Sequence, residues 1–306
     1  MKEEKKLPDL TILARPPKVL IVAKQNKPGL RAARKLEKHL KEKIKDISFD
    51  PSTARRVKRL RKRGTSIKKF DGNMIITLGG DGTMLMTAHQ AKVPILPVRI
   101  EGHGFLCTTT LKELLMNLDK LVRNDYRVIN RLRIKSSKLR KGRVERYVDR
   151  ILHRTYDLAL NEIVFARRRP SKILVIEFKI DDTPFEFRGD GLMVSTPSGS
   201  TAYSASAGGA VIDPNLNAVI ITPLYPFFSK IKPIVIPADK KIEVKIKEGD
   251  CAVIIDGHGG EYIKEESEFI IERGEPLRVI NLFEKSFYER FKKEFIEAPV
   301  KRNKGS

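Results

Sequence analysis

The sequence reads Met74-Ile75-Ile76-Thr77-Leu78-Gly79-Gly80-Asp81-Gly82-Thr83 where a short apolar run passes into a glycine-rich turn. The length of the run and its β-branched residues predict a buried strand over residues 74–78, and the helical segment that follows spans Thr83 to Gln90. Glycines allow a ligand to approach the backbone closely, and N–H groups at a helix N-terminus favour phosphate oxygens. The unit therefore predicts an α/β fold with a ligand at the carboxyl ends of the strands.

The same alternation of strand and helix surrounds this unit. Lys18–Ala23 and Val93–Val98 are short apolar runs typical of buried strands, although the prolines of the second favour an edge or the strand ends. Leu30–Ile44 and Leu111–Val122 have apolar residues at helical spacing. We expect an N-terminal α/β domain over residues 1–125, built on a doubly wound parallel sheet.

After residue 125 the pattern changes to short or alternating apolar runs, with turn residues every eight to twelve positions. These runs predict a mainly β domain over residues 126–275. They are Arg143–Leu152, Thr155–Leu160, Ile173–Ile180, Glu186–Arg188, Gly191–Ser195, Ala218–Ile221, Ile234–Ile236, Ile242–Ile246, Ala252–Ile255 and Phe269–Glu272.

The last segment, residues 276–306, has a different character. Phe283, Phe287, Phe291 and Phe295 recur at every fourth position, which predicts a helix over Leu282–Ile296 with an aromatic stripe. Such a stripe is typical of core packing, so we expect this C-terminal helix to return to the N-terminal domain.

The composition narrows the class of protein. Hydrophobic residues make up 41% of the chain, enough for a packed core, and no apolar run reaches the 18 residues of a membrane span. The two cysteines form no C-x-x-C pair, and the charged start lacks the apolar segment of a secretory signal. These features predict a reduced, soluble, cytoplasmic protein without membrane contacts.

The net charge of +23 is concentrated in basic stretches, Arg55–Lys69 and Arg131–Arg154. Such stretches suit a polyanionic partner, but they also suit the solvated surface of a heat-adapted protein. The absence of Trp and the presence of only two Gln fit a thermophile-like chain. Because Arg55–Lys69 contains no aromatic residue and Arg131–Arg154 contains only Tyr147, the stretches do not favour nucleic acid as the partner.

Asp81 is the candidate catalytic residue. A carboxylate repels phosphate, so its place in a phosphate-binding turn favours a proton acceptor or a group that orients Mg²⁺. The turn is neither a P-loop nor a dinucleotide fingerprint, because the spacing of both motifs is absent. The alternative is a glycine-rich turn with an aspartate that caps the helix.

A second candidate stretch runs from Asp190 to Tyr203 and contains Thr196-Pro197-Ser198-Gly199-Ser200-Thr201. Its hydroxyl groups and small residues suit hydrogen bonds to a polar ligand, with Tyr203 as a flat apolar wall. A turn beside a tight helix is the alternative, and a serine nucleophile is excluded because the G-x-S-x-G spacing is absent. The pair Asn161-Glu162 is a weaker signal for ribose or base contacts, and the five histidines show no metal-ligand spacing.

These motifs together resemble the NAD kinase family. The resemblance rests on Gly79-Gly80-Asp81-Gly82-Thr83, on Asn161-Glu162, on Asp190-Gly191 through Ser198–Tyr203, and on Thr222-Pro223 and Asp256-Gly257, all in the family's order. It implies an α/β N-terminal domain and a β-rich C-terminal domain, with NAD bound between them. It also implies transfer of the γ-phosphoryl group of ATP or polyphosphate to the 2′-hydroxyl of the adenosine ribose of NAD, with Mg²⁺ or another divalent metal.

The resemblance assigns roles by position. Asp81 would be the base; no protein side chain is assigned as a metal ligand. Asp190 would reach NAD from a neighbouring subunit, which implies a homodimer or homotetramer. The remaining residues implied to bind nucleotide are Gly79, Gly80, Gly82, Thr83, Phe105, Asn161, Glu162, Arg188, Ser198, Thr201, Ala202, Tyr203, Ser206 and Asp256.

One segment departs from the family pattern. Where the family has Asn-x-Gly-x-Leu-Gly-Phe-Leu, this chain has Arg99-Ile100-Glu101-Gly102-His103-Gly104-Phe105-Leu106. This departure leaves open NADH instead of NAD, or a kinase of the same superfamily that acts on a lipid, sugar or nucleoside. A catalytically silent dinucleotide or nucleic-acid binder is a further alternative, against which the intact Asp81 argues.

Overall fold

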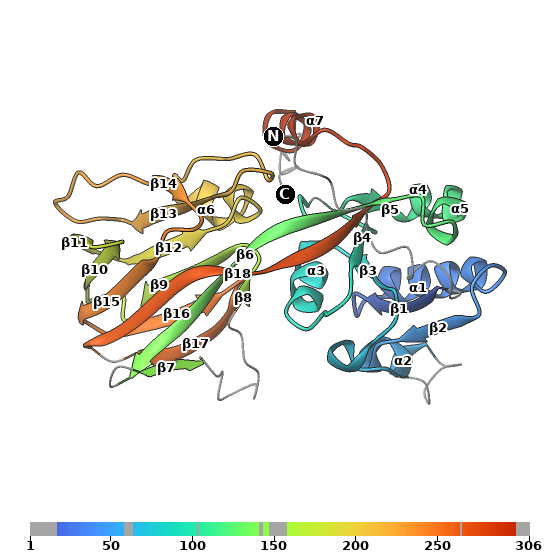
Figure 1. Ribbon diagram of the computed structural model, residues 1–306, viewed down its shortest axis with the longest axis horizontal. Coiled ribbons are helices and arrows are strands. Elements are labelled where there is room, and N and C mark those ends of the chain that lie inside the picture. The colour runs from blue at the N-terminus through green and yellow to red at the C-terminus, as the bar shows by residue number, and fades with distance from the viewer. Residues whose placement is uncertain are drawn as a thin grey trace, which may run out of the picture. The chain divides into compact units, whose positions relative to one another are not determined.

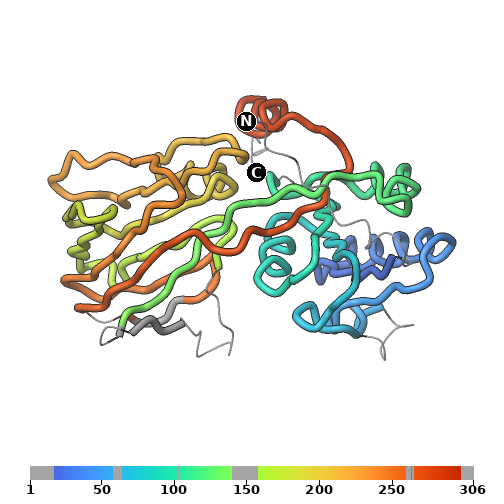
Figure 2. The backbone as a smooth tube through the Cα atoms, in the orientation of Figure 1, coloured from blue at the N-terminus to red at the C-terminus, as the bar shows by residue number. Residues whose placement is uncertain are grey.

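The computed structural model describes residues 17–57, 64–102, 104–140, 143–146, 158–263 and 265–297 (Figure 1). The contacts divide the chain into two compact units. The first unit comprises the chain up to Ile129 together with Arg278–Ser286, and the second comprises Asn130–Leu277 together with the segment from Phe287 onward. The backbone trace in Figure 2 therefore passes through the first unit, the second, the first again and the second again.

The first unit is built on a parallel sheet. Its strands lie in the order β4-β3-β1-β2, and they are β1 (Lys18–Ala23), β2 (Asp46–Phe49), β3 (Met74–Gly79) and β4 (Ile95–Arg99). The predicted parallel α/β sheet is confirmed. The sequence did not predict β2, whose four residues are too few for a clear pattern.

Strand β4 is not an edge strand; of the two places that its prolines favoured, only the strand end applies, to Pro94, which directly precedes β4. The short strand β5 (Thr109–Thr110) pairs with its last two residues, and the end of β18 (Ser267–Asn281) pairs with Ile95. Pro97 lies between the residue that pairs with β18 and the residues that pair with β5. Its carbonyl accepts a hydrogen bond from the N–H of Thr108. A residue without an N–H is tolerated there because neither partial partner strand pairs with it.

The helices of the first unit are α1 (Lys27–Leu40), α2 (Pro51–Arg56), α3 (Asp81–Ala88), α4 (Leu111–Met116) and α5 (Leu118–Val122). The predicted helix over Leu111–Val122 is split at Asn117, whose side-chain amide donates to the carbonyl of Glu113 and competes with the backbone. Apolar side chains of α1, the sheet and α4–α5 share one core, which includes Leu36, Ile76 and Leu121.

The second unit is mainly antiparallel β-structure, as predicted. One sheet has the order β14-β13-β12-β9-β16-β17, and its strands are β9 (Glu162–Arg167), β12 (Gly191–Ser195), β13 (Ala218–Leu224), β14 (Ile234–Pro237), β16 (Cys251–Ile255) and β17 (His258–Ile263). The other contains β6 (Arg127–Arg140), β7 (Arg143–Arg146), β8 (Leu158–Ala159), β10 (Leu174–Ile180), β11 (Thr183–Gly189), β15 (Ile242–Glu248) and the first part of β18.

The core of the second unit fixes which face of the six-stranded sheet is available for function. Ile163, Phe165 and Val194 belong to this core, where Phe165 meets the ring of Phe269 at 5.1 Å. Because side chains alternate along a strand, Glu162 and Ser195 lie on the opposite face of the same sheet.

The C-terminal helix forms, but not as an α-helix throughout. Helix α7 (Phe287–Phe291) continues into a π-helical turn over Lys292–Ile296, and neighbouring rings of the aromatic stripe stack at 4.9 Å between Phe291 and Phe295. None of the side chains of this helix is buried, so Phe287, Phe291 and Phe295 are not the core element that their spacing suggested, whereas Phe283, which precedes the helix, packs against the core of the first unit. Residues 278–286 belong to the first unit, whereas α7 belongs to the second.

Some sequence-based expectations lie outside the described residues. They concern residues 58–63 of the first basic stretch, residues 141–142 and 147–154 of the second, residues 155–157 of the predicted run Thr155–Leu160, and His103. Within the described part of the chain, no helix is long and apolar enough to cross a membrane.

Candidate functional site

The glycine-rich turn joins β3 to α3 as predicted, although α3 begins at Asp81, two residues earlier than expected. Gly79 must be a glycine, because a Cβ there would lie 2.2 Å from the hydroxyl oxygen of Thr83. Gly80 and Gly82 are different: a Cβ at either would meet nothing within 4 Å. The backbone of these two residues therefore borders open space, which leaves room for a ligand at the start of α3.

The side chain of Asp81 is held by the segment that departs from the family pattern. Its Oδ2 accepts the N–H of Phe105 at 2.9 Å, and its Oδ1 accepts the N–H of Leu106 at 3.1 Å. A Cβ on Gly104 would come within 2.4 Å of Oδ1. The three residues that the segment shares with the family, Gly104-Phe105-Leu106, are thus the ones that contact Asp81.

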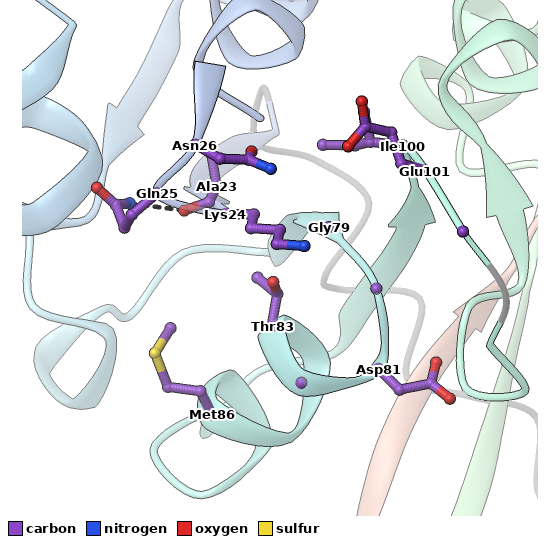
Figure 3. A pocket seen from close by; sticks show the side chains of 13 residues that line it. Ala23, Lys24, Gln25, Asn26, Gly79, Asp81, Thr83, Met86, Ile100 and Glu101 are labelled. Atoms are coloured by element: carbon purple, nitrogen blue, oxygen red, sulfur yellow. Dashed lines mark hydrogen bonds between the residues drawn. The ribbon is translucent and has the colours of Figure 1, made fainter. Parts of the chain in front are cut away.

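A cavity of about 560 Å³ opens beside this turn (Figure 3). Figure 3 shows Lys24 extending toward Gly79 and Thr83, whereas the carboxylate of Asp81 is turned away from Lys24. The lining residues are Ala23, Lys24, Gln25, Asn26, Gly79, Gly80, Asp81, Gly82, Thr83, Met86, Ile100, Glu101 and Gly102.

The sequence reasoning missed the contribution of the β1–α1 loop to this cavity. Asn26 caps α1 by accepting the N–H of Gly29 at 2.9 Å, and Gln25 donates to the carbonyl of Ala23 at 2.6 Å. Lys24 follows β1 directly, as Gly80 follows β3, and the two strands are parallel neighbours. That adjacency was the available signal, because the carboxyl ends of neighbouring parallel strands meet at one edge of the sheet.

The polar groups that line this cavity suit the binding of phosphate together with a divalent cation. Lys24 and the N–H groups at the start of α3 suit anionic oxygens. The carboxylate of Glu101 would hold Mg²⁺, which binds proteins through one or two carboxylates and completes its shell with substrate phosphates and water. Among the described residues no cluster of three or more His, Cys, Asp or Glu could hold a metal by itself.

In the second unit the structure brings two of the predicted motifs together. The N–H of Thr196 donates to the carbonyl of Asn161 at 2.8 Å, and its hydroxyl donates to the carbonyl of Leu160. Gly199 packs so closely that a Cβ would lie 2.1 Å from the Asn161 carbonyl oxygen. The Asn161-Glu162 pair and the hydroxyl-rich loop after β12 therefore form one structure.

Further along this loop the predicted residues differ in exposure. Ser198 is buried, Thr201 and Ala202 are half-buried, and Ser206 is exposed at the end of α6 (Tyr203–Ser206). Tyr203 is 48% exposed, so its ring is accessible for stacking against a flat ligand.

Several buried polar atoms in this region have no hydrogen-bond partner within the described structure. Such atoms are costly, and they mark places where water or a ligand completes the hydrogen bonding. Ser195 and Thr222 lie in motifs named from the sequence but were not assigned to the site, and Ser204 was not named, because nothing in the sequence places their strands and helix together. The atoms are Asn161 Oδ1, Glu162 Oε2, Ser195 Oγ, Ser204 Oγ and Thr222 Oγ1.

Two buried carboxyl groups lie at this site. Burial raises the pKa of Glu162 to about 7, and the nearby Asp256 carboxylate adds to the effect. Burial also raises the pKa of Asp256 to about 6, against the opposing effect of three backbone N–H donors. The carboxylate of Asp256 accepts hydrogen bonds from the backbone N–H groups of residues 160–162, so it holds the backbone of the Asn161-Glu162 motif in place.

Asp190 and Arg188 are not part of this group. Asp190 precedes β12 and pairs with Arg167 at 3.0 Å, whereas Ser195 ends the same strand. Five residues of extended chain span about 17 Å, so Asp190 and Ser195 mark opposite ends of the strand. Arg188 is exposed, and its carbonyl accepts the N–H of Phe227 at 2.7 Å.

Comparisons with known proteins show the family to which this chain belongs. The sequence models of the ATP-NAD kinase N-terminal and C-terminal domains match residues 14–126 and 160–281. The NAD kinase of Methanothermobacter thermautotrophicus is 33% identical over 85% of this chain and 89% of its own length. The NAD kinase of Thermococcus kodakarensis is 30% identical over 89% of this chain and 96% of its own length.

Two solved structures are similar. An NAD kinase from Archaeoglobus fulgidus in complex with ATP has a TM-score of 0.67 and 25% identity, covering 91% of this chain and 97% of its own. The yeast NADH kinase complexed with NADH shares the fold, with a TM-score of 0.80 at 20% identity over 96% of this chain and 91% of its own. Matching models for both domains and relatives at 30% identity or more over nearly the full length show that this chain belongs to the ATP-NAD kinase family.

Proposed function

We propose that this protein is an NAD kinase that transfers the γ-phosphoryl group of ATP to the 2′-hydroxyl of the adenosine ribose of NAD. The observation that carries the proposal is the turn at the start of α3, where Asp81 lies beside a cavity of about 560 Å³ that is bordered by bare glycine backbone. The ATP complex of the Archaeoglobus relative supports ATP as the donor.

In this proposal the turn separates two tasks. On the cavity side, Lys24 and the N–H groups of α3 hold the donor phosphates. On the other side, the Asp81 carboxylate takes the proton as the ribose oxygen forms its bond to phosphorus and the bond to the leaving ADP oxygen breaks. A carboxylate has about four lone-pair sites, so Asp81 can accept these two backbone N–H groups and still act as a proton acceptor.

Mg²⁺ fits the cavity and would neutralise phosphate charge there when bound. The protein supplies the rest through position: the hydrogen bonds from Phe105 and Leu106 fix the Asp81 carboxylate before the acceptor arrives. Phosphoryl transfer depends mainly on such alignment and on charge stabilisation.

The dinucleotide is assigned to the second-unit site. The unpartnered oxygens of Asn161 and Glu162 suit the hydroxyls or amide of NAD, and the exposed ring of Tyr203 suits a flat base. Ser198, Thr201, Ala202 and Ser206 complete the proposed contacts. NADH remains a second acceptor to be tested, because the yeast structure of the same fold contains NADH.

The proposal is tested by incubating the purified protein with NAD, ATP and Mg²⁺ and detecting NADP with an NADP-specific dehydrogenase. We expect NADP from the wild type and a kcat lower by about 10²–10⁴ in Asp81→Asn, because the amide cannot accept the proton as a base does. A variant within tenfold of wild type would remove Asp81 from the base role. No product with NAD, with NADH and polyphosphate tried in turn, would direct the search to lipid, sugar and nucleoside acceptors.

We also propose a homodimer or homotetramer. Arg188 and Asp190 lie at the far end of β12 from Ser195, and beside them is a loop with exposed aromatic side chains, Tyr225, Phe227 and Phe228. Phe228 is 97% exposed, so a second copy of the chain would bury substantial apolar area there. Light scattering should give the mass of two or four chains, and Phe228→Ser should shift it toward one; a monomeric wild type refutes this assembly.

A further inference from the structure

Asp256 and Gly257 form the turn between β16 and β17. Both have positive φ, +49° and +74°, which is the conformation of a tight Asp-Gly hairpin turn. An aspartate in such a turn normally faces water, yet Asp256 is only 4% exposed. Its burial requires partners for the carboxylate, and they come from a different part of the chain.

Those partners are three consecutive backbone N–H groups. Asp256 Oδ2 accepts from Leu160 at 2.7 Å, and Oδ1 accepts from Asn161 at 2.7 Å and from Glu162 at 3.0 Å. In return the N–H of Asp256 donates to the carbonyl of Glu162 at 3.0 Å. Leu160 and Asn161 lie in the bend between β8 and β9, where no strand ladder satisfies their N–H groups, so one side chain holds the bend.

The same bend organises the hydroxyl-rich loop. Its two carbonyls, of Leu160 and Asn161, accept the hydroxyl and the N–H of Thr196, and Gly199 packs against the second one. A continuous path of contacts therefore runs from Asp256 through the bend to the loop that carries Ser198 and Thr201.

We propose that Asp256 is a positioning residue that fixes the Asn161-Glu162 bend, and through it the Thr196–Thr201 loop, in the geometry that binds the acceptor dinucleotide. Asp256 acts through the backbone and does not itself touch the ligand. This role rests on the proposed NAD kinase function, and it extends the sequence expectation that Asp256 is simply one more nucleotide-binding residue.

The chemistry of the contact predicts which substitution disrupts it. Asparagine has the same shape but offers a single acceptor oxygen and an NH₂ group. In Asp256→Asn that NH₂ group must face at least one of three N–H donors, so a repulsive donor–donor contact replaces a charge-assisted hydrogen bond. The bend would then shift while the β16–β17 turn itself is conserved, because asparagine also tolerates positive φ.

The first test measures the bend without any ligand. Hydrogen exchange followed by mass spectrometry should show faster exchange of the amides of residues 160–162 in Asp256→Asn, by about tenfold or more if the loss is about 1.4 kcal/mol. The matched control is Asp182→Asn, an exposed turn aspartate of the same unit, which should leave these amides unchanged. Unchanged exchange in folded Asp256→Asn would overturn the proposal, whatever the enzyme phosphorylates.

The second test measures steady-state kinetics with NAD and ATP. We expect KM for NAD to rise about tenfold or more, with kcat and KM for ATP within about threefold of wild type. A proportional loss of kcat at unchanged KM would mean that fewer molecules fold, and it would overturn the positioning role. Absence of NADP from the wild type would refute the proposed function alone, because the exchange result stands apart from it.

A second variant covers the case in which Asp256→Asn does not fold. Thr196→Val keeps the Asp256 contacts and the backbone hydrogen bond of residue 196, but it removes the hydroxyl that joins the carbonyl of Leu160 to the N–H of Gly199 in the loop. It should raise KM for NAD about threefold to tenfold with kcat maintained. An unchanged KM for NAD in folded Thr196→Val would break the path of contacts and contradict the proposal.

Discussion

At the scale of single residues, the cavity of the first unit is defined by one cation and by backbone rather than by many side chains. Lys24 is exposed, follows β1 and reaches toward Gly79 and Thr83 (Figure 3). Glycine turns supply N–H donors without charge, so Lys24 supplies the positive charge that the glycine turn itself lacks. Donor affinity should therefore depend on this residue more strongly than on the other lysines around it.

Replacing Lys24 by alanine should raise KM for ATP about tenfold and change KM for NAD little, because a hydrogen bond to a charged group contributes about 1.5–3 kcal/mol when it is sheltered and less when it is exposed. Initial-rate measurements at saturating NAD check the prediction. Lys38→Ala, an exposed lysine in the last turn of α1, is the control and should resemble wild type. Equal effects of both substitutions would show that only general charge matters.

Tyr203 is the matching single-residue case in the second unit. Tyr203→Ala should raise KM for NAD about twofold to tenfold, since an aromatic contact contributes about 0.5–1.5 kcal/mol. Tyr203→Phe retains the ring and should stay near wild type. Calorimetry with NAD measures both, and an alanine variant that binds as tightly as wild type refutes the contact.

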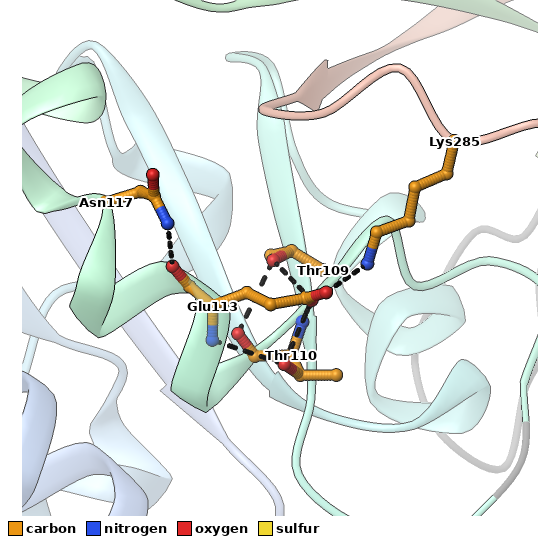
Figure 4. A network of polar contacts seen from close by, with 5 residues as sticks. All are labelled: Thr109, Thr110, Glu113, Asn117 and Lys285. Atoms are coloured by element: carbon orange, nitrogen blue, oxygen red, sulfur yellow. Dashed lines mark hydrogen bonds and ion pairs between the residues drawn. The ribbon is translucent and has the colours of Figure 1, made fainter.

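At the scale of elements, the first turn of α4 forms a polar network with the returning C-terminal segment (Figure 4). Glu113 accepts the N–H and the hydroxyl of Thr110 at 2.8 and 2.9 Å, which makes a capping box. The other carboxylate oxygen of Glu113 accepts a hydrogen bond from the ammonium group of Lys285 and forms an ion pair with it. Partial burial by itself would raise the pKa of Glu113, but Lys285 and Thr110 outweigh it and lower that pKa to about 2.

This network predicts an acid-dependent loss of stability. Because the pKa of Glu113 is lower in the folded protein than its ordinary value of 4.5, the ionised group stabilises the fold above about pH 4.5, and the stabilisation is lost as the pH falls toward 2. The side chain is 36% exposed, so solvent screening limits the effect to about 1 kcal/mol. Glu113→Gln should lower the melting temperature at pH 6 and converge with wild type near pH 2–3.

The control for Glu113→Gln is Glu284→Gln. Glu284 pairs with Arg127, but both side chains are more than 70% exposed, so its loss should be nearly neutral. Melting curves of the two variants and wild type between pH 3 and pH 7 separate the outcomes. A parallel shift of Glu113→Gln at every pH would contradict the electrostatic account.

The periodicity of apolar residues predicted those helices and strands in which only apolar side chains are buried. It failed where a polar side chain is buried by contacts with residues far away in the sequence. Strand β6 was missed because polar residues occupy buried positions in it: Ser136 and Ser137 are buried, and Arg133 is 8% exposed and donates to the carbonyl of Glu275 at 2.6 Å. The glycine turn and the hydroxyl-rich loop were recognisable because, in each of them, the residues of the motif are consecutive in the sequence. Lys24 and Ser195 were not, because their roles depend on which strands are neighbours.

At the scale of the whole molecule, the first unit is discontinuous in sequence. Residues 278–286 complete it: Val279 pairs with Ile95 of β4, the carbonyl of Ile280 accepts from the hydroxyl of Thr108, and Leu282 enters the core. The N-terminal part of the chain therefore cannot finish its own fold until nearly all of the sequence has been synthesised, although domains commonly fold in the order of synthesis.

A truncation after Leu277 should destabilise the first unit by several kcal/mol, since burying Ile280 and Leu282 contributes about 2–5 kcal/mol for each large side chain. A truncation after Ser286 removes α7 and keeps those contacts, so it serves as the control. Limited proteolysis with mass spectrometry should show cleavage within residues 17–129 only in the shorter chain. Equal resistance of both would mean that the returning segment is dispensable.

The glycines in and beside the β3–α3 turn differ in whether a Cβ atom would fit. A mutational scan that measures both the abundance of folded protein and its activity would separate the two groups. Alanine at Gly79 or Gly104 collides with Thr83 or with Asp81, so cells should contain less folded protein. Alanine at Gly80 or Gly82 meets only open space, so folded protein should remain at normal abundance while its turnover falls. The three glycines of the turn, together with Gly104 of the segment after β4, would thus divide between selection for folding and selection for catalysis.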